Sequence, residues 1–244
     1  MEKLYSEQFP IPCYMFDCCE RLRPSSFFDI AQELAAKGSA QIGATDQDLL
    51  PHSLVWILAR MTVCFDSLPR RLDTVTAQTW HRGLVGSSFI RDYALLDALG
   101  RPCVRSTSSW IIMDTRKRTI ARPDSLAGIV DSNPQNTAYA IEQPCAKIVL
   151  PASAALVKSD ERKVLYSDLD YNGHVNNARY IVWALDCLPL DTVKTRPVRQ
   201  ISVNFNREAR PGDIVELNTL QAADTCYVEG RDAAGRMFVV QIIF

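Results

Sequence analysis

Three things are scarce in this chain of 244 residues: long apolar runs, histidine, and an excess of charge of either sign. No apolar run reaches the roughly 18 residues that span a bilayer, so we expect no membrane insertion. The formal net charge of −1 gives no general attraction to nucleic acid, so we expect no nucleic-acid partner. The three histidines have no ligand-like spacing to one another or to a cysteine pair, so we expect no metal and no cofactor.

A secretion signal and a Cys-x-x-Cys motif are also missing. The first eight residues contain no apolar run of the kind found in signal peptides, so we expect a cytoplasmic protein or one that has already been processed. Eight cysteines are present, scattered through apolar stretches such as 63–65. Because cysteines stay reduced inside cells, we expect free, mostly buried thiols that act as small hydrophobic side chains.

One segment of the chain occurs twice. Residues 63–75 and 203–215 share five residues at a constant offset of 140. The shared residues, in the first copy, are Val63, Phe65, Arg70, Asp73 and Val75. A second match follows in the same order, where Asp97–Arg101 returns as Asp232–Arg236 at an offset of 135. Two matches in the same order indicate that one domain has been duplicated, and Asp-Ala-x-Gly-Arg predicts a hairpin turn with positive φ at glycine.

Both halves have the same order of predicted elements. The first half reads as an extended run over 9–19, a helix over 25–42 and strands over 54–65, 75–80, 88–96 and 104–113. The second half reads as an extended run near 164, a helix with Val175, Ala178, Ile181, Val182 and Leu185 on its buried face, and strands over 201–205, 214–220, 226–228 and 238–244. A long helix followed by an antiparallel meander, twice, predicts an α+β fold in which each sheet wraps its helix. The domains are 1–130 and 131–244, and the proline-containing connector 122–161 carries one strand over 147–150.

Polar residues crowd the start of the second helix, between Tyr166 and Tyr180. Asp and Asn at a helix start satisfy free backbone N–H groups and favour the helix dipole, which accounts for one or two of these residues. Capping does not account for His174, whose cationic form opposes the dipole, with Asp170 close by in sequence. The cluster therefore favours a functional site, with helix capping as the alternative.

The stretch from Asp170 to Tyr180 reads Asp-x-x-Gly-His-Val-Asn-Asn-x-x-Tyr, which resembles the signature of hot-dog thioesterases. The longer run 168–177 is similar to that of plant and bacterial acyl-ACP thioesterases, where ACP is acyl carrier protein. Similar blocks occur at 54–61, 79–80, 108–113 and 206–208. The resemblance implies two tandem hot-dog domains, the first binding the acyl chain and the second carrying the catalytic residues. It also implies hydrolysis of fatty acyl-ACP to free fatty acid, which terminates fatty-acid synthesis, with acyl-ACP as the partner.

Carried over by position, Asp170, Asn172, His174 and Glu208 match the catalytic positions of that family. Plant members place a cysteine directly after the glutamate, whereas this chain has Ala209. A thiolate mechanism at this position is therefore excluded, and hydrolysis must depend on carboxylates, histidine and asparagine.

The chemistry of a thioester suits such a site, because the carbonyl is electrophilic and the thiol leaves readily. We expect Glu208, with His174, to hold and deprotonate a water, and Asn172 to orient the carbonyl or the water. Asp170 would fix the tautomer of His174 or attack directly to give an anhydride. Backbone N–H groups over 175–177 would stabilise the oxyanion.

Only the second half carries this set of groups. Leu68 stands where the offset of 140 places the counterpart of Glu208, and no histidine precedes His52. The first half should therefore hold the acyl chain. The aromatic residues expected around it are Phe27, Phe28, Trp56 and Trp80.

Several alternatives stay open from the sequence alone. The chain could instead be an acyl-CoA thioesterase with the same fold, or a non-enzymatic module that senses acyl thioesters. The basic run Arg116–Arg118 is either a solvated loop or a docking surface for an acidic carrier protein. Acyl chain length, saturation preference and a homodimer also stay open.

Overall fold

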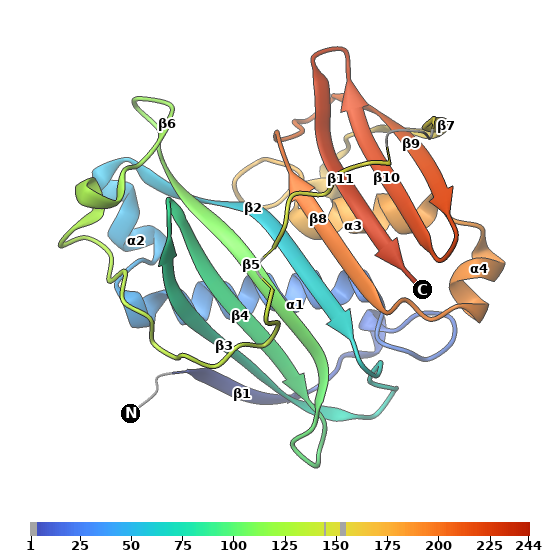
Figure 1. The fold of residues 1–244 in the computed structure, drawn as a ribbon, viewed down its shortest axis with the longest axis horizontal. Coiled ribbons are helices and arrows are strands. Elements are labelled where there is room, and N and C mark those ends of the chain that lie inside the picture. The colour runs from blue at the N-terminus through green and yellow to red at the C-terminus, as the bar shows by residue number, and fades with distance from the viewer. Residues whose placement is uncertain (1–3, 144, 152–154) are drawn as a thin grey trace. The chain divides into compact units, whose positions relative to one another are not determined.

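The structure, a computed structural model, describes residues 4–143, 145–151 and 155–244. Contacts divide the chain into two units, Met1–Cys13 with Ile30–Ala146, and Tyr14–Asp29 with Lys147–Phe244. In each unit an antiparallel sheet carries a helix against one face (Figure 1). The expected α+β plan is therefore present in both units.

The first unit is built on six strands. They are β1 (Tyr5–Pro10), β2 (Leu54–Phe65), β3 (Thr74–Val85), β4 (Ser88–Leu96), β5 (Pro102–Asp114) and β6 (Thr119–Ile120). The order across the sheet is β1-β3-β4-β5-β2, and β6 pairs with β5. Its helical elements are α1 (Pro24–Ser39), α2 (Asp46–Leu49) and the 3-10 turns Ala40–Ile42, Leu50–His52 and Pro123–Leu126. Of α1, the contacts assign residues 24–29 to the second unit and 30–39 to the first.

The second unit repeats this topology. Its strands are β7 (Val157–Lys163), β8 (Gln200–Phe205), β9 (Ile214–Ala222), β10 (Thr225–Asp232) and β11 (Gly235–Ile243). The order is β7-β9-β10-β11-β8, which matches β1-β3-β4-β5-β2 strand for strand. Its helices are α3 (Asn177–Asp186) and α4 (Leu190–Thr195), and the 3-10 turns Cys13–Met15 and Tyr166–Asp168 precede α1 and α3. The repeated strand order agrees with the duplication predicted from the sequence.

The predicted hairpin turns are confirmed. The β4–β5 turn has Gly100 at φ +75°, and β11 begins with Gly235 at φ +122°. Asp97 closes the first turn by accepting hydrogen bonds from the backbone N–H groups of Leu99 and Arg101, both at 2.9 Å. Glycine takes the left-handed conformation here without the steric cost of a side chain.

Two predicted elements are wrong in position. The extended run expected over 9–19 is a strand only as far as Pro10, and a 3-10 turn with a tight loop follows. No strand occupies 147–150 in the described chain, and the strand that opens the second unit is β7. The expected N-terminal domain, 1–130, includes residues 1–3, which lie outside the described part.

The buried face of α3 also differs from the prediction. Tyr180, Trp183 and Ala184 are buried with Ala178 and Ile181, whereas Val182 and Leu185 are only half-buried. The Tyr180 ring forms an edge contact with the ring of Phe238, at 4.9 Å between centroids. Large aromatic rings bury more apolar area than Val or Leu, and this sets the helix rotation.

The four aromatic residues expected around the acyl chain are divided between the two units. Trp56 makes edge contacts with Phe89 and Trp110 in the first unit. Trp80 instead packs with Ala140 of the connector, and its indole N–H donates to the carbonyl of Ala138 at 2.9 Å. Phe27 and Phe28 lie in the segment that the contacts assign to the second unit.

All eight cysteines are free thiols, as predicted, but most are not buried. Only Cys103, Cys145 and Cys226 are buried, while Cys13 and Cys18 are exposed. In the described part of the chain no helix is both long and apolar enough to cross a membrane.

The ring of Phe238 packs directly against Gly230 in the second sheet. A Cβ atom added at Gly230 would lie 1.9 Å from Cε1 of Phe238, whose ring is buried. We expect Gly230→Ala to lower the free energy of unfolding by about 2 kcal/mol, the usual scale of overpacking. In a Phe238→Leu background the same change should cost much less, because the ring is gone. Urea denaturation of the four variants measures both costs, and equal costs would contradict the assigned clash.

Candidate active site

The loop before α3 is a closed frame built by Asp170. Leu169 and Val175 pair as an isolated β-bridge at its base. Asp170 Oδ1 accepts hydrogen bonds from the backbone N–H groups of Asn172, at 2.9 Å, and His174, at 3.2 Å. Gly173 turns the chain with φ +78°. These bonds fix the backbone from which the His174 imidazole projects.

Helix α3 begins directly after this frame. The side chain of Asn176 caps it by accepting a hydrogen bond from Ala178 N at 2.8 Å. Asp168 is buried, accepts a hydrogen bond from Arg179 Nε at 3.1 Å, and its backbone carbonyl accepts one from Asn176 N at 2.9 Å. Capping thus accounts for Asn176, and Asp168 is held by Arg179 and Leu165, whereas no such bond in the described structure occupies the side chain of Asn172.

A second loop, between β8 and β9, carries Glu208. The next residue, Ala209, is fully buried. Its carbonyl accepts a hydrogen bond from Val175 N at 3.1 Å, and its N–H donates to the hydroxyl of Tyr180 at 3.0 Å. Backbone hydrogen bonds therefore join the Glu208 loop to the His174 loop.

The two side chains meet at the surface. His174 Nε2 lies 3.4 Å from Glu208 Oε2, and the side chains are 35% and 45% exposed. This exposure leaves room for a water molecule and a substrate carbonyl beside the pair. A carboxylate paired with an imidazole is a suitable general base, because either group can hold the proton that a water loses.

The first half contains the same loop without the chemistry. Asp17 Oδ1 accepts hydrogen bonds from Cys19 N, at 2.8 Å, and Arg21 N, at 3.0 Å, and Phe16 pairs with Leu22 as an isolated bridge. From the sequence, the start of the first helix near Arg21 to Ser26 was expected to lack a counterpart of His174, and the Asp17 frame before it was not foreseen. The spacing Asp-x-x-x-Arg, flanked by apolar residues, is the signal that would have identified it.

When the two loops are aligned by sequence at an offset of 153, Arg21 corresponds to His174 and Cys19 corresponds to Asn172. The Arg21 guanidinium is occupied by Asp17 and by the carbonyl of Val193. The first-half loop keeps the frame but carries neither a base nor an amide at these positions.

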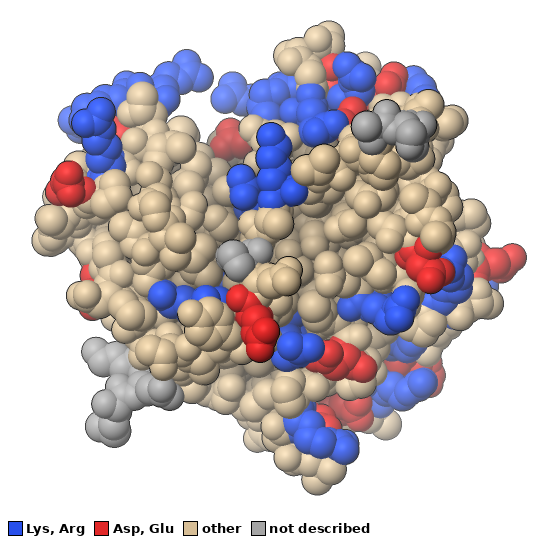
Figure 2. Space-filling view, in the orientation of Figure 1, with Lys and Arg blue, Asp and Glu red and all other residues tan. Residues whose placement is uncertain are grey.

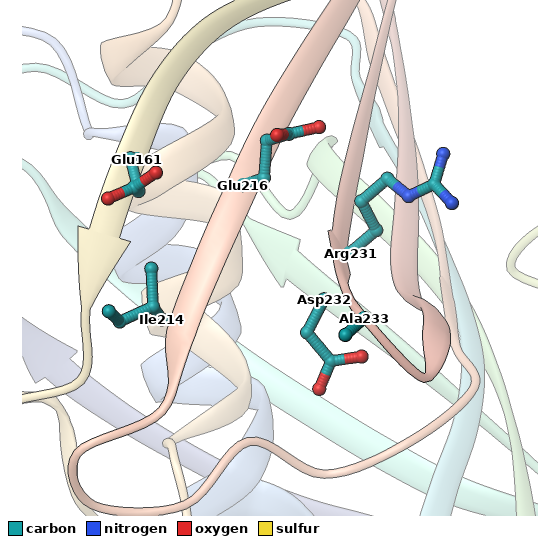
Figure 3. A pocket seen from close by; sticks show the side chains of 6 residues that line it. All are labelled: Glu161, Ile214, Glu216, Arg231, Asp232 and Ala233. Atoms are coloured by element: carbon teal, nitrogen blue, oxygen red, sulfur yellow. The ribbon is translucent and has the colours of Figure 1, made fainter.

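Two surface hollows lie away from the His174–Glu208 pair. One, of about 370 Å³, is lined by β7, β9 and the β10–β11 hairpin, with Glu161 and Glu216 on neighbouring strands (Figure 3). Its carboxylates already have partners, since Glu216 pairs with Lys158 and Asp232 with Arg207. The other, of about 510 Å³, includes Leu68 in the first unit. None of the four catalytic candidates lines either hollow.

Nowhere in the described chain do three or more His, Cys, Asp or Glu side chains gather in a way that could hold a metal ion.

Comparison with known families settles the membership of the chain. The family model of the acyl-ACP thioesterase N-terminal domain matches residues 2–126, and that of the C-terminal domain matches residues 153–232. The chain belongs to the acyl-ACP thioesterase family. The tandem hot-dog fold implied by the sequence resemblance is thereby confirmed for this thioesterase.

Curated relatives of this thioesterase include two plant proteins. Oleoyl-acyl carrier protein thioesterase 1 of Arabidopsis thaliana, named chloroplastic, is 26% identical over 95% of this chain and 67% of its own length. The oleoyl-acyl carrier protein thioesterase of Coriandrum sativum is 25% identical over 90% of this chain and 63% of its own. The chain thus spans about two thirds of the length of these relatives.

Solved structures agree in fold. An acyl-ACP thioesterase from Bacteroides thetaiotaomicron has a TM-score of 0.83 at 22% identity, covering 99% of this chain and 97% of its own. The 12:0-ACP thioesterase of Umbellularia californica has a TM-score of 0.80 at 18% identity, covering 98% and 96%.

Two expected roles do not fit the geometry of this thioesterase. In the described structure no hydrogen bond joins the Asp170 carboxylate to the imidazole of His174; its Oδ1 binds backbone amides instead. The N–H groups of Val175 and Asn176 already donate to Ala209 and Asp168. Those two amides are therefore not free to stabilise an oxyanion.

Alkylation of the thiols tests whether hydrolysis proceeds without a cysteine nucleophile, as Ala209 implies. Burial raises the pKa of Cys103, Cys145 and Cys226 to about 11, so these thiols react slowly at neutral pH. Mild alkylation should therefore modify the exposed Cys13 and Cys18 first and leave most hydrolytic activity intact. Mass spectrometry and a free-thiol release assay after gel filtration give both readouts. A stoichiometric, substrate-protected loss of activity mapped to Cys187 or Cys226 would contradict it.

Proposed function

We propose that this thioesterase hydrolyses fatty acyl-ACP thioesters to free fatty acid and ACP, with Glu208 and His174 as the general-base pair. The contact that carries the proposal is the approach of His174 Nε2 to Glu208 Oε2 within a family of acyl-ACP thioesterases. Alanine at position 209 supports a mechanism that uses water as the nucleophile.

In this mechanism a water attacks the thioester carbonyl carbon while the Glu208–His174 pair takes its proton. The new C–O bond forms a tetrahedral oxyanion, and the C–S bond then breaks as the pair returns the proton to the sulfur. The products are a carboxylic acid and the carrier thiol, so atoms and charge balance. Asp170 contributes by holding the loop backbone from which the His174 side chain projects.

Two groups are suited to bind the oxyanion. Asn172 lies two residues before His174 in the same loop, and its exposed side chain can donate from its amide. Asn177, the first residue of α3, has no partner for its N–H within the described structure. Donors of this kind stabilise the oxyanion best when they are not already bonded within the protein.

The test of the general base is Glu208→Gln, which keeps the shape and removes the proton acceptor. We expect kcat to fall on the order of 10²-fold or more, as is usual for loss of a general base. Because the side chain is 45% exposed, the free energy of unfolding should change by less than about 0.5 kcal/mol.

Glu161→Gln is the matched control for that variant. Glu161 is an exposed carboxylate on β7 of the same unit, and it pairs with Lys158 at the surface. Its kcat should be that of the parent. Full activity of Glu208→Gln would exclude the proposed function of the pair.

A comparison of acyl-ACP with acyl-CoA as substrates distinguishes the two enzymatic alternatives. The turn from β5 to β6 carries Arg116, Lys117 and Arg118, all exposed, and Figure 2 shows Lys and Arg side chains gathered at that end of the first unit. Lys117 pairs with Asp114 at 3.2 Å, while no ion pair holds Arg116 or Arg118 in the described structure. We propose that these two free guanidinium groups dock the acidic surface of ACP, which CoA lacks.

Charge reversal at this turn separates ACP from CoA. Arg116→Glu with Arg118→Glu should raise KM for acyl-ACP several-fold and leave hydrolysis of the same acyl-CoA unchanged, and the parent reaction with ACP should weaken with salt. The matched control is Arg70→Glu with Arg71→Glu, an equal charge change on another exposed turn of the first unit. Equal effects on both substrates would exclude this docking surface.

Two further expectations remain proposals. Binding of the acyl chain by the first domain, 1–130, is supported by its lack of catalytic groups. A cytoplasmic location also remains a proposal, and homodimer formation stays open.

A further inference from the structure

Tyr180 carries a hydroxyl that helix packing does not require. The side chain is 3% exposed, and its ring makes edge contacts with Trp183, Phe205 and Phe238. A phenylalanine ring would make the same contacts. The hydroxyl adds the 3.0 Å hydrogen bond that it accepts from Ala209 N.

That bond holds the residue next to Glu208. Ala209 is fixed on both sides, because its N–H donates to Tyr180 and its carbonyl accepts from Val175, the residue after His174. The backbone on which Glu208 stands is thus tied to α3 and to the His174 loop at once. Burial raises the pKa of Tyr180 to about 12, and the charge of Glu208 contributes to the rise, so the hydroxyl stays neutral.

The first half serves as an internal comparison. At the offset of 153 the counterpart of Tyr180 is Phe27, and at the offset of 140 the counterpart of Ala209 is Pro69. Phenylalanine has no hydroxyl and proline has no N–H, so this hydrogen bond has neither partner there. The half without the catalytic groups also lacks both partners of the bond.

The offset of 140 is supported by matched bonds. Arg70 N donates to Asp73 Oδ2 at 2.8 Å, as Arg210 N does to Asp213 Oδ2 at 2.9 Å. The two loops therefore have the same local conformation, and their chemical difference at Pro69 is not a consequence of a different fold.

Building on the proposed function, we propose that Tyr180 is a positioning residue for hydrolysis. Its hydroxyl, through the N–H of Ala209, holds the Glu208 carboxylate within reach of His174. It does not touch substrate. Loss of the hydroxyl should lower the fraction of time in which the pair is aligned, which reduces turnover rather than substrate binding.

Tyr180→Phe tests this directly. We expect kcat to fall about tenfold, KM for acyl-ACP to stay within about twofold, and the acidic limb of the pH–rate profile to move as the Glu208–His174 contact loosens. Tyr227→Phe is the matched control, since Tyr227 of β10 also accepts one side-chain hydrogen bond, from Gln241 at 3.1 Å. It should lose similar stability and keep the parent kcat and pH profile.

Removal of the donor should reproduce the effect. Ala209→Pro deletes the N–H and introduces the residue found in the first-half loop, where the matched turn accepts it. If one hydrogen bond is responsible, the double variant should be no slower than the slower single variant. Losses that multiply, or a parental kcat and pH profile in Tyr180→Phe, would overturn the proposal.

These outcomes are distinguishable from failure of the proposed function. If Glu208 is not the base, Glu208→Gln keeps its activity. If only the role of Tyr180 is wrong, Glu208→Gln is inactive while Tyr180→Phe matches Tyr227→Phe in kcat and pH profile.

Discussion

The hydrogen bond from Val175 N to the carbonyl of Ala209, 3.1 Å long, is the contact on which the site depends. It joins two loops that are more than 30 residues apart in the chain and places the residues next to it, His174 and Glu208, side by side. The side chains themselves approach only to 3.4 Å and are half exposed. A solvent-exposed pair of this kind contributes little binding energy of its own. Alignment must therefore come from the backbone, which is rigid where its amides are satisfied.

The duplicated loop shows that frame and chemistry are separable. Both halves keep an aspartate whose Oδ1 accepts two backbone amides, at positions 17 and 170. Both turn through a positive φ, +58° at Glu20 and +78° at Gly173. A non-glycine residue tolerates this conformation only at some cost, which the surrounding bonds offset. Both copies keep the loop frame because a helix follows it in each half. Only the second copy carries an imidazole, that of His174, at the end of the loop.

Much of the fold could be predicted because its signals are local. Strands 54–65 and 88–96 were predicted to the residue, since runs rich in apolar, β-branched and aromatic residues end at turn residues. The run 9–19 misled because proline, cysteine and apolar residues suit an edge strand and a tight loop equally well. On α3, helical spacing could not choose between the face with Val182 and the face with Tyr180, because the facing aromatic rings decide it.

For the site, the resemblance proposed the residues but not their contacts. That Glu208 meets His174 agrees with the expectation, whereas the hydrogen bonds of the Asp170 carboxylate to backbone amides were not expected. Use of the Val175 and Asn176 amides within the protein was equally hidden. Hydrogen bonds between main-chain groups are set by the fold, so residue identity cannot reveal them.

The side chains on the inner faces of the two sheets differ, in line with the separation of the loop frame from the candidate catalytic groups. On the face where the first unit has Arg91, Tyr93, Ser106 and Ser108, matched strand pairs in the second unit have Cys226, Val228, Val240 and Ile242.

Two of these polar side chains bond to neighbours on this face, since Ser108 Oγ forms hydrogen bonds with the carbonyl of Arg91 at 3.0 Å and with the hydroxyl of Tyr93 at 3.2 Å. In the second unit Gly230 lets the Phe238 ring close onto the sheet beneath Tyr180. A catalytic pair needs support that holds it to about half an ångström, and dense apolar packing supplies this better than an adaptable polar network. The unit that carries His174 and Glu208 is thus the one whose sheet is the more apolar on this face.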